Sequence, residues 1–330
     1  ASVPLLWGGA PGPAPSSRPR LQALMGRSLP RCGPGPCWSP GDASELRVRA
    51  GPDYRRQGLK AASMPALYEG VGADIVCGAC RLDEVLPRLG PLPEGGCGWR
   101  RELGVPRVLV VNCQMPKHEG PKLFGEHPRD DAGSSVVGQF VASPDLLRVA
   151  AADVGLEGAD LGSTLEAYLP AVRLLRRFVE RGSLELGRGE RGGAYSSCTL
   201  KCIGWVENLD EVELPRILRP SVERYNGKPV LLTGFGRMHM DPKGEWMEID
   251  IDVRKFSWPT RSIVCRLREK LREVTVHMAW VIQGTEDDEL PEVVLASMRV
   301  HNADLDRGFW VEDPRASCSP DLDGPDPLQI

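Results

Sequence analysis

The stretch from Gly244 to Ser297 decides the fold of this chain. It begins with GEWMEIDIDVRKFSWPT at 244–260, continues through a basic helical pattern and ends with HMAWVIQGTEDDELPEVVLAS at 277–297. Apolar and acidic residues alternate in its first part, which is the period of a β-strand. The stretch therefore predicts strand, helix and strand with almost no loop, and Leu290-Pro291-Glu292 indicates the start of another helix.

Other segments carry strand signals of the same kind. Alternating or continuously apolar runs predict strands at 45–50, 106–113, 134–142, 198–206 and 274–282. Strands and helices are mixed without the strand–helix–strand alternation of a parallel sheet. The sequence thus predicts an α+β fold, in which a mainly antiparallel curved sheet packs with two or three amphipathic helices and extended arms leave both ends.

Composition divides the chain into three parts. Residues 1–36 are rich in Pro and Gly, and residues 311–330 form an acidic, Pro-rich tail. Neither segment has enough apolar surface to offset the entropy lost on ordering. We therefore expect one domain at 37–310 and two arms that neighbouring molecules hold in place. The chain begins at Ala1 rather than Met, which we interpret as a processed form.

Charge and cysteine content narrow the class of protein. The net charge of −4 argues against a general nucleic-acid binder. No run approaches the ~18–20 apolar residues that a transmembrane helix needs. The ten cysteines are scattered, and several lie in apolar strand patterns, which indicates buried free thiols in a reducing compartment.

Two predicted helices carry basic faces. The first, at 163–182, starts with the capping box Ser163–Glu166, and Pro170 should bend it or reset its start. The second spans 260–272. Such faces are most often solvated, but they also fit anionic lipid headgroups or an acidic protein surface. The residues predicted for this membrane or partner contact are Arg173, Arg176, Arg177, Arg266 and Lys270.

A charged hairpin is predicted around the turn Asp241–Gly244. If Asp241 opposes Gly244, then Arg237 opposes Glu248. Glu248, Asp250 and Asp252 then share one face, where three carboxylates could bind a hard cation or serve acid–base chemistry. No supporting motif accompanies them, so we favour a solvated face with a structural Arg237–Glu248 ion pair.

The remaining chemical motifs are weak. Cys77-Gly78-Ala79-Cys80 has the CxxC form, and a short helix at 81–89 supplies half of the context that a redox pair needs. A zinc site lacks two further ligands at suitable spacing, and the five histidines are dispersed. We therefore predict no enzymatic activity, no metal and no cofactor, with a thiol reaction at Cys77 and Cys80 as a minor alternative.

Short motifs follow one another in the order of a known family. They are Trp38–Gly41, Val48–Tyr54, Lys60, Val71–Asp74, Leu109–Asn112, Asp131–Ser135, Lys228-Pro229, Met247–Asp252 and Glu289–Glu292. From about Trp38 to Asp306 the chain thus resembles the C-terminal domain family of the plant Enhanced Disease Resistance proteins. The resemblance implies an association with membranes or lipids, because in relatives this domain often follows a lipid-binding module.

Two functions are compatible with these features. The first is a non-catalytic structural or linker subunit that docks peripherally on a larger, membrane-embedded organellar complex. The resemblance favours a thylakoid photosystem–antenna assembly, because family members occur in photosynthetic eukaryotes. The alternative is a membrane-associated lipid-binding module with an apolar cavity inside the curved sheet. We expect the plastid stroma or thylakoid surface, while the mitochondrial matrix and the cytosol also fit.

Overall fold

The computed structural model describes residues 28–51, 54–89, 91–117, 133–156, 161–185, 199–214, 216, 219–232 and 235–311. Residues 1–27 and 312–330, which make up most of the two predicted arms, lie outside the described residues.

Six strands form the larger sheet, in the order β13-β4-β6-β5-β10-β9. β10 runs parallel to β5 and β13 runs parallel to β4, whereas the other neighbours are antiparallel. The continuous apolar runs of β5 and β6 lie in the middle of this sheet, where both faces are covered. In sheet order the strands are Phe309–Val311, Tyr68–Gly78, Gly133–Ala142, Val108–Pro116, Trp246–Asp252 and Gly236–Met240.

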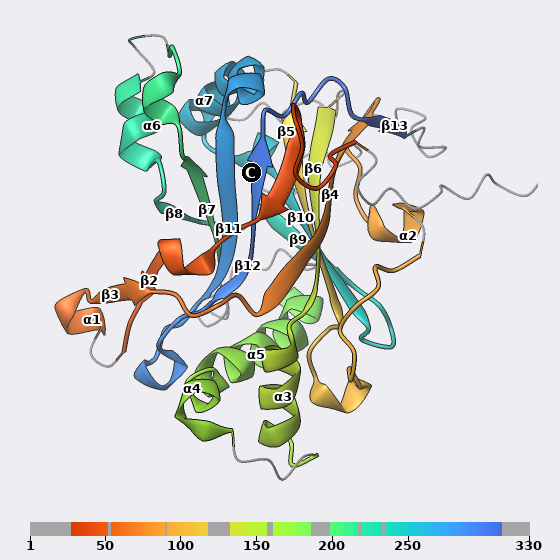
Figure 1. The fold of residues 1–330 in the computed structure, drawn as a ribbon, viewed down its shortest axis with the longest axis vertical. Coiled ribbons are helices and arrows are strands. Elements are labelled where there is room, and N and C mark those ends of the chain that lie inside the picture. The colour runs from red at the N-terminus through yellow and green to blue at the C-terminus, as the bar shows by residue number, and fades with distance from the viewer. Residues whose placement is uncertain are drawn as a thin grey trace, which may run out of the picture.

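A second sheet of five antiparallel strands has the order β1-β12-β11-β7-β8. Its strands in that order are Cys37–Pro40, Val294–His301, Thr275–Gln283, Thr199–Val206 and Pro229–Leu231. β2 (Arg47–Arg49) and β3 (Lys60–Ala62) form a separate antiparallel ribbon that projects from one side of the molecule (Figure 1).

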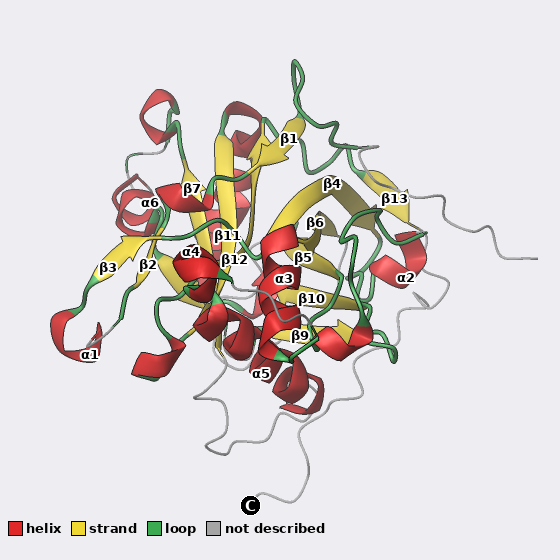
Figure 2. Ribbon diagram, turned by 60° about the horizontal axis from the view of Figure 1, so that its bottom comes forward, coloured by secondary structure: helices red, strands yellow, loops and turns green. Residues whose placement is uncertain are grey.

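The two large sheets face each other, and their side chains fill the space between them. Phe140 on β6 and Trp280 on β11 meet edge to face, with ring centroids 5.8 Å apart. Gly138 on β6 permits the two sheets to lie this close, because a Cβ atom at this position would be only 2.9 Å from the sulfur of Met298 on β12. Figure 2 shows the larger sheet curling around this core, so the predicted α+β class with a curved sheet is confirmed.

Helices close the two ends of the sheets. α3 (Pro144–Asp153), α4 (Gly162–Glu166) and α5 (Leu169–Glu185) pack at one end, whereas α7 (Trp258–Arg268) lies at the other (Figure 1). None of the helices in the described ranges is long and apolar enough to cross a membrane. The remaining helices are α6 (Arg219–Tyr225), α1 (Tyr54–Gln57) and α2 (Leu86–Leu89).

Two predicted helix signals behave differently in the structure. Pro170 resets the helix as expected, because α4 ends at Glu166 and α5 begins at Leu169. The capping box was wrong, since Leu161 occupies the N-cap and provides no side-chain hydrogen bond. The helix start at Leu290-Pro291-Glu292 was also wrong, because the apolar run that follows pairs with β11 as strand β12.

Candidate functional site

The charged hairpin has a different register from the predicted one. Asp241 opposes Trp246 rather than Gly244, because its side chain accepts hydrogen bonds from the Lys243 and Glu245 amides and holds a longer loop. Glu248 consequently pairs with His239, and the predicted Arg237–Glu248 ion pair does not form. The guanidinium of Arg237 instead lies 3.7 Å from the Asp83 carboxylate.

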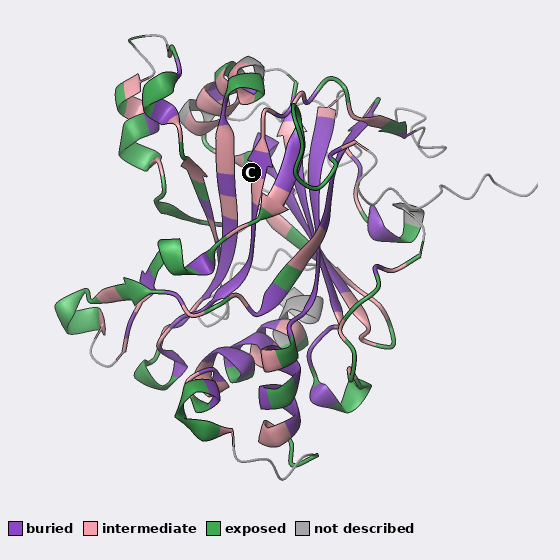
Figure 3. Cartoon of the chain, viewed as in Figure 1, coloured by how far each residue is buried: buried purple, intermediate pink, exposed green. Residues whose placement is uncertain are grey.

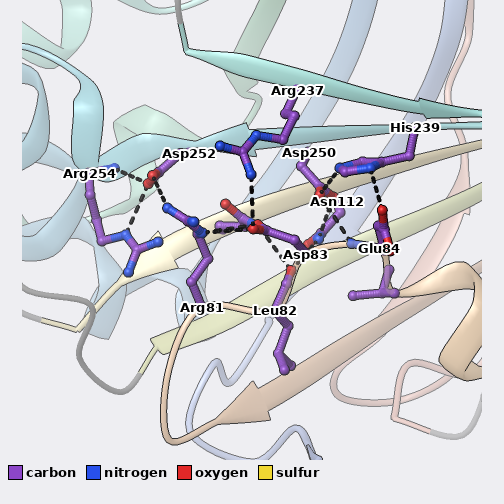
Figure 4. Close-up of polar contacts among 12 residues, drawn as sticks. Arg81, Leu82, Asp83, Glu84, Asn112, Arg237, His239, Asp250, Asp252 and Arg254 are labelled. Carbon is purple, nitrogen blue, oxygen red and sulfur yellow. Dashed lines mark hydrogen bonds and ion pairs between the residues drawn. The ribbon is translucent and has the colours of Figure 1, made fainter. Parts of the chain in front are cut away.

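Glu248, Asp250 and Asp252 share one face of β10, as predicted, but they are buried rather than solvated. The segment between β4 and α2 covers this face (Figure 4). Glu248 accepts hydrogen bonds from the Val85 and Leu86 amides at 2.7 and 2.8 Å. Its burial, together with the charge of Asp250, raises the pKa of Glu248 well above its usual range.

Asp250 joins the same loop to the neighbouring strands. It accepts hydrogen bonds from the Glu84 amide and from the Asn112 side chain. His239 lies between two carboxylates, with Nε2 3.0 Å from Asp250 and Nδ1 2.9 Å from Glu84. The hydrogen bond to Asp250 raises the pKa of His239.

Arginines neutralise the end of this network. Arg254 and Arg81 pair with Asp252 at 2.9 and 3.2 Å, and Arg81 also pairs with Asp83 at 3.0 Å. The Gln114 side chain fixes the loop by donating to the Leu82 carbonyl. Backbone amides and guanidinium groups thus occupy the carboxylates, so the network anchors a loop and does not fit a hard-cation site.

The CxxC motif lacks the environment of a redox pair. Cys77 is the last residue but one of β4, and its thiol contacts the Leu305 carbonyl at 3.4 Å. Burial raises the pKa of Cys77, whereas a reactive thiol needs a lowered one. Cys77 and Cys80 are both free thiols, and the helix that follows begins only at Leu86.

The predicted basic contact residues do not form one surface. Arg173 and Arg176 both pair with Asp153, and Arg176 also donates to the Leu103 and Ala150 carbonyls. Arg177 lies 2.8 Å from Glu289. On the other basic helix, Arg266 is exposed and Lys270 pairs with Glu273 at 3.0 Å. Because α5 and α7 lie at opposite ends of the molecule (Figure 1), a membrane could not contact both faces at once.

A cluster around His277 has metal-binding residue types. Ligand atoms of Glu45, Glu207 and His277 lie within 4.8 Å of one another. However, Arg299 already bridges the two carboxylates, with Nε 2.6 Å from Glu207 and Nη2 in contact with Glu45. A cation would have to displace this guanidinium, so the cluster fits an ion-pair network better than a metal site.

A cleft of about 630 Å³ opens beside the N-terminus of α3. Three of its polar side chains are committed to the fold. Ser143 caps α3 by accepting from the Leu146 amide, and the Tyr68 hydroxyl donates to the Pro106 carbonyl. The Asp42 side chain accepts from the Ser44 amide. We therefore assign this cleft no binding role.

A smaller cleft of about 60 Å³ has a concentration of cations. It lies between the β2–β3 ribbon and the outer face of the five-stranded sheet. Glu292 at its base is buried and accepts both bonds from the Lys201 ammonium, at 2.7 and 2.6 Å. Its charged lining consists of Arg47, Arg49, Lys60, Lys201 and Glu292.

Exposed apolar side chains flank this basic cleft. Leu231 on edge strand β8 is 46% exposed and lies directly opposite Lys201, on the same face of the sheet. Leu59 is 49% exposed, but it precedes Lys60 and opposes Ala50, so its side chain lies on the other face of the ribbon. Figure 3 shows α1 and the β8 edge as exposed segments on the same side of the molecule. We call the surface formed by Arg47, Lys60, Pro229 and Leu231 the ribbon face.

The residues of the basic cleft were not selected from the sequence as a site. The sequence places Arg47 and Arg49 in an alternating strand, and it places Arg49, Lys60 and Glu292 in family motifs. One available signal was Lys201, a charged residue within an otherwise apolar strand pattern, which requires a partner when buried. That partner, Glu292, is distant in sequence.

The fold defines an α+β domain in which two facing sheets enclose a packed core. This chain belongs to the family described as "Protein ENHANCED DISEASE RESISTANCE 2, C-terminal", whose model matches residues 38–304. The match covers most of the chain and confirms the resemblance inferred from its motifs. Neither the curated proteins nor the solved structures contain a match.

Proposed function

We propose that this domain associates peripherally with anionic membranes through the ribbon face. The observation that carries the proposal is the combination of exposed apolar side chains and cations around one cleft. Leu231 lies beside the cleft that Arg47 and Lys60 line, and these two cations have no ion-pair partner among the described residues. Basic residues contribute ~1 kcal/mol each near an anionic surface. Full burial of a Leu side chain adds ~1.5–3 kcal/mol.

A surface site fits the packing better than an internal lipid cavity. The space between the sheets is filled by large side chains such as Trp38, Phe140 and Trp280, each buried. The curled sheet is compatible with a lipid-binding module, but its concave side is already the hydrophobic core. The lipid would therefore meet the outside of the five-stranded sheet.

Docking on a larger organellar membrane complex stays a prediction. It was based on the two arms, most of which lie outside the described residues. The described residues add no specific support for a photosystem linker. The absence of enzymatic activity and of a cofactor, and the plastid location, also stay predictions.

Sedimentation with lipid vesicles tests membrane association. The full chain should bind vesicles of phosphatidylcholine with phosphatidylserine, should not bind phosphatidylcholine alone, and should dissociate as salt screens the charges. Leu231→Glu should weaken binding about tenfold, because it replaces an inserting side chain with an anion, a change of ~1.4 kcal/mol or more.

Trp310→Glu is the matched control, because it introduces the same charge at another exposed apolar position. Trp310 is 57% exposed on β13, on the side of the molecule away from the β2–β3 ribbon (Figure 1). This variant should bind as tightly as the unmodified chain. Equal binding of both variants, or no binding of the unmodified chain to phosphatidylserine, would contradict the proposal.

A further inference from the structure

The basic cleft has a surplus of positive charge. Four cations and one carboxylate line it, which leaves a formal surplus of three charges. Glu292 is fully occupied, because Lys201 and the Gly284 and Arg49 amides all donate to it. The two cations of the ribbon, Arg47 and Lys60, have no carboxylate partner in the described parts of the chain. Among the described residues, the Arg47 guanidinium donates to the Lys60 carbonyl alone, at 2.6 Å.

The remaining arginine of the cleft is held in place by its neighbours. The Arg49 guanidinium lies over the Tyr54 ring, 4.7 Å from the centroid, and donates to the Gly284 carbonyl. Its Nε atom is 3.8 Å from Glu292. A planar guanidinium fixed in this way is suited to binding a tetrahedral oxyanion.

The cations of the cleft repel one another. Burial lowers the pKa of Lys201, and the positive charges of Arg49 and Lys60 lower it further, against the effect of Glu292. An anion in the cleft would relieve this repulsion.

The size of the cleft limits the ligand to a small group. One water occupies about 10–15 Å³ of such space. The cleft offers about 60 Å³, which is enough for several waters or one phosphoryl group but not for an acyl chain or a base.

We propose that the basic cleft binds the phosphomonoester of a membrane lipid headgroup, with Arg47 and Lys60 at its mouth and Lys201 at its base. This inference rests on the proposed membrane association and names the lipid class that the ribbon face selects. A phosphomonoester carries about −1.5 to −2 charges at pH 7. It therefore neutralises more of the three surplus positive charges of the cleft than a phosphodiester or a carboxylate, each of which carries a single negative charge. The exposed Leu231 beside the cleft selects a lipid source over free phosphate.

Two vesicle compositions of equal surface charge test this selectivity. One contains phosphatidylcholine with a phosphatidylinositol monophosphate, and the other contains phosphatidylcholine with phosphatidylserine. The full chain should bind the first at least tenfold more tightly. The double variant Arg47→Gln/Lys60→Gln should lose about 25-fold in affinity for it, which is roughly fivefold for each cation.

Arg148→Gln is the control for a general loss of charge. Arg148 is exposed on α3, at the end of the molecule where α3, α4 and α5 pack. This variant should keep the preference for the phosphomonoester lipid. Calorimetric titration with soluble inositol monophosphate should give binding to the unmodified chain and to Arg148→Gln, but not to the double variant.

The outcomes separate this inference from membrane association itself. Binding to phosphatidylserine vesicles that depends on Leu231, without a preference for the phosphomonoester lipid, overturns the inference and leaves membrane association standing. Binding of inositol monophosphate, or of a phosphoserine peptide, without vesicle preference overturns the lipid source. Absence of binding to any vesicle overturns both proposals.

Discussion

His277 and His239 lie in two polar clusters that shift their pKa values in opposite directions. His277 on β11 is fully buried, stacks on Trp205, and has Nδ1 3.4 Å from Glu45 and 3.7 Å from Glu207. Burial lowers its pKa to about 4, and the charge of Arg299 acts in the same direction. Glu207 and Asp42 oppose this shift. His239 has a raised pKa because of Asp250.

We predict opposite pH effects for the two histidines. In the unfolded chain His277 titrates near 6.5, so acidification from about 6.5 to about 4 protonates the unfolded state first and destabilises the fold. In the unmodified chain this protonation should lower the free energy of unfolding by about 1–3 kcal/mol, and in His277→Phe this decrease should be absent. Urea unfolding at several pH values measures it.

His239→Gln provides the comparison of opposite sign. The raised pKa of His239 stabilises the fold below the unfolded value of 6.5, and this contribution disappears as the pH rises through the folded value. His239→Gln should therefore destabilise the protein more in mild acid than in mild base. An unchanged pH dependence in either variant would contradict the assignment.

At the scale of elements, β10 holds the loop between β4 and α2 through Glu248. The sequence pattern correctly placed its three acidic residues on one face, because side chains alternate along a strand. It did not indicate burial, since the covering loop comes from a distant part of the chain. The register also differed, because the Asp241 side chain supports a loop longer than a four-residue turn.

We predict that Glu248→Met releases this loop. The substitution keeps the side-chain length but leaves the Val85 and Leu86 amides buried without acceptors, which costs about 2–4 kcal/mol. Hydrogen exchange at these two amides should accelerate more than at β11. Glu166→Met, at an exposed position of α4, should change stability by less than ~0.5 kcal/mol. Protection of Val85 and Leu86 in Glu248→Met would exclude the anchoring role.

At the scale of the molecule, the packed domain begins before Cys37. Leu29 is fully buried and bridges to Ala73 on β4. Ser28 hydrogen bonds to Asp74 and accepts from the Ile75 amide. Part of the segment assigned to the N-terminal arm therefore belongs to the core.

Leu29→Ala tests how strongly this segment contributes. The substitution removes a side chain from the space between the sheets, so the free energy of unfolding should fall by about 2–5 kcal/mol. Leu59→Ala, at a 49% exposed position, should change it by less than ~0.5 kcal/mol. Equal stability of the two variants would show that residues 28–30 do not support the core. Chemical denaturation measures both.

The sequence by itself determined the α+β class, most strands, the break at Pro170 and the family. These features depend on local periodicity, on ring constraints and on the order of short motifs, which are readable without contacts. The alternation in β10 and the apolar runs of β5 and β6 are examples.

Only the tertiary structure decided which charges are buried, paired or available. Lys201 and Glu292 are far apart in the chain but lie within hydrogen-bond distance of each other. Arg237 lies near Asp83 and not near Glu248. The physical reason is that pairing depends on distance and solvent exposure, which sheet order and loop coverage set. For the same reason, the candidate membrane contact is the ribbon face and not the two predicted basic helix faces, whose arginines are mostly paired with acidic side chains.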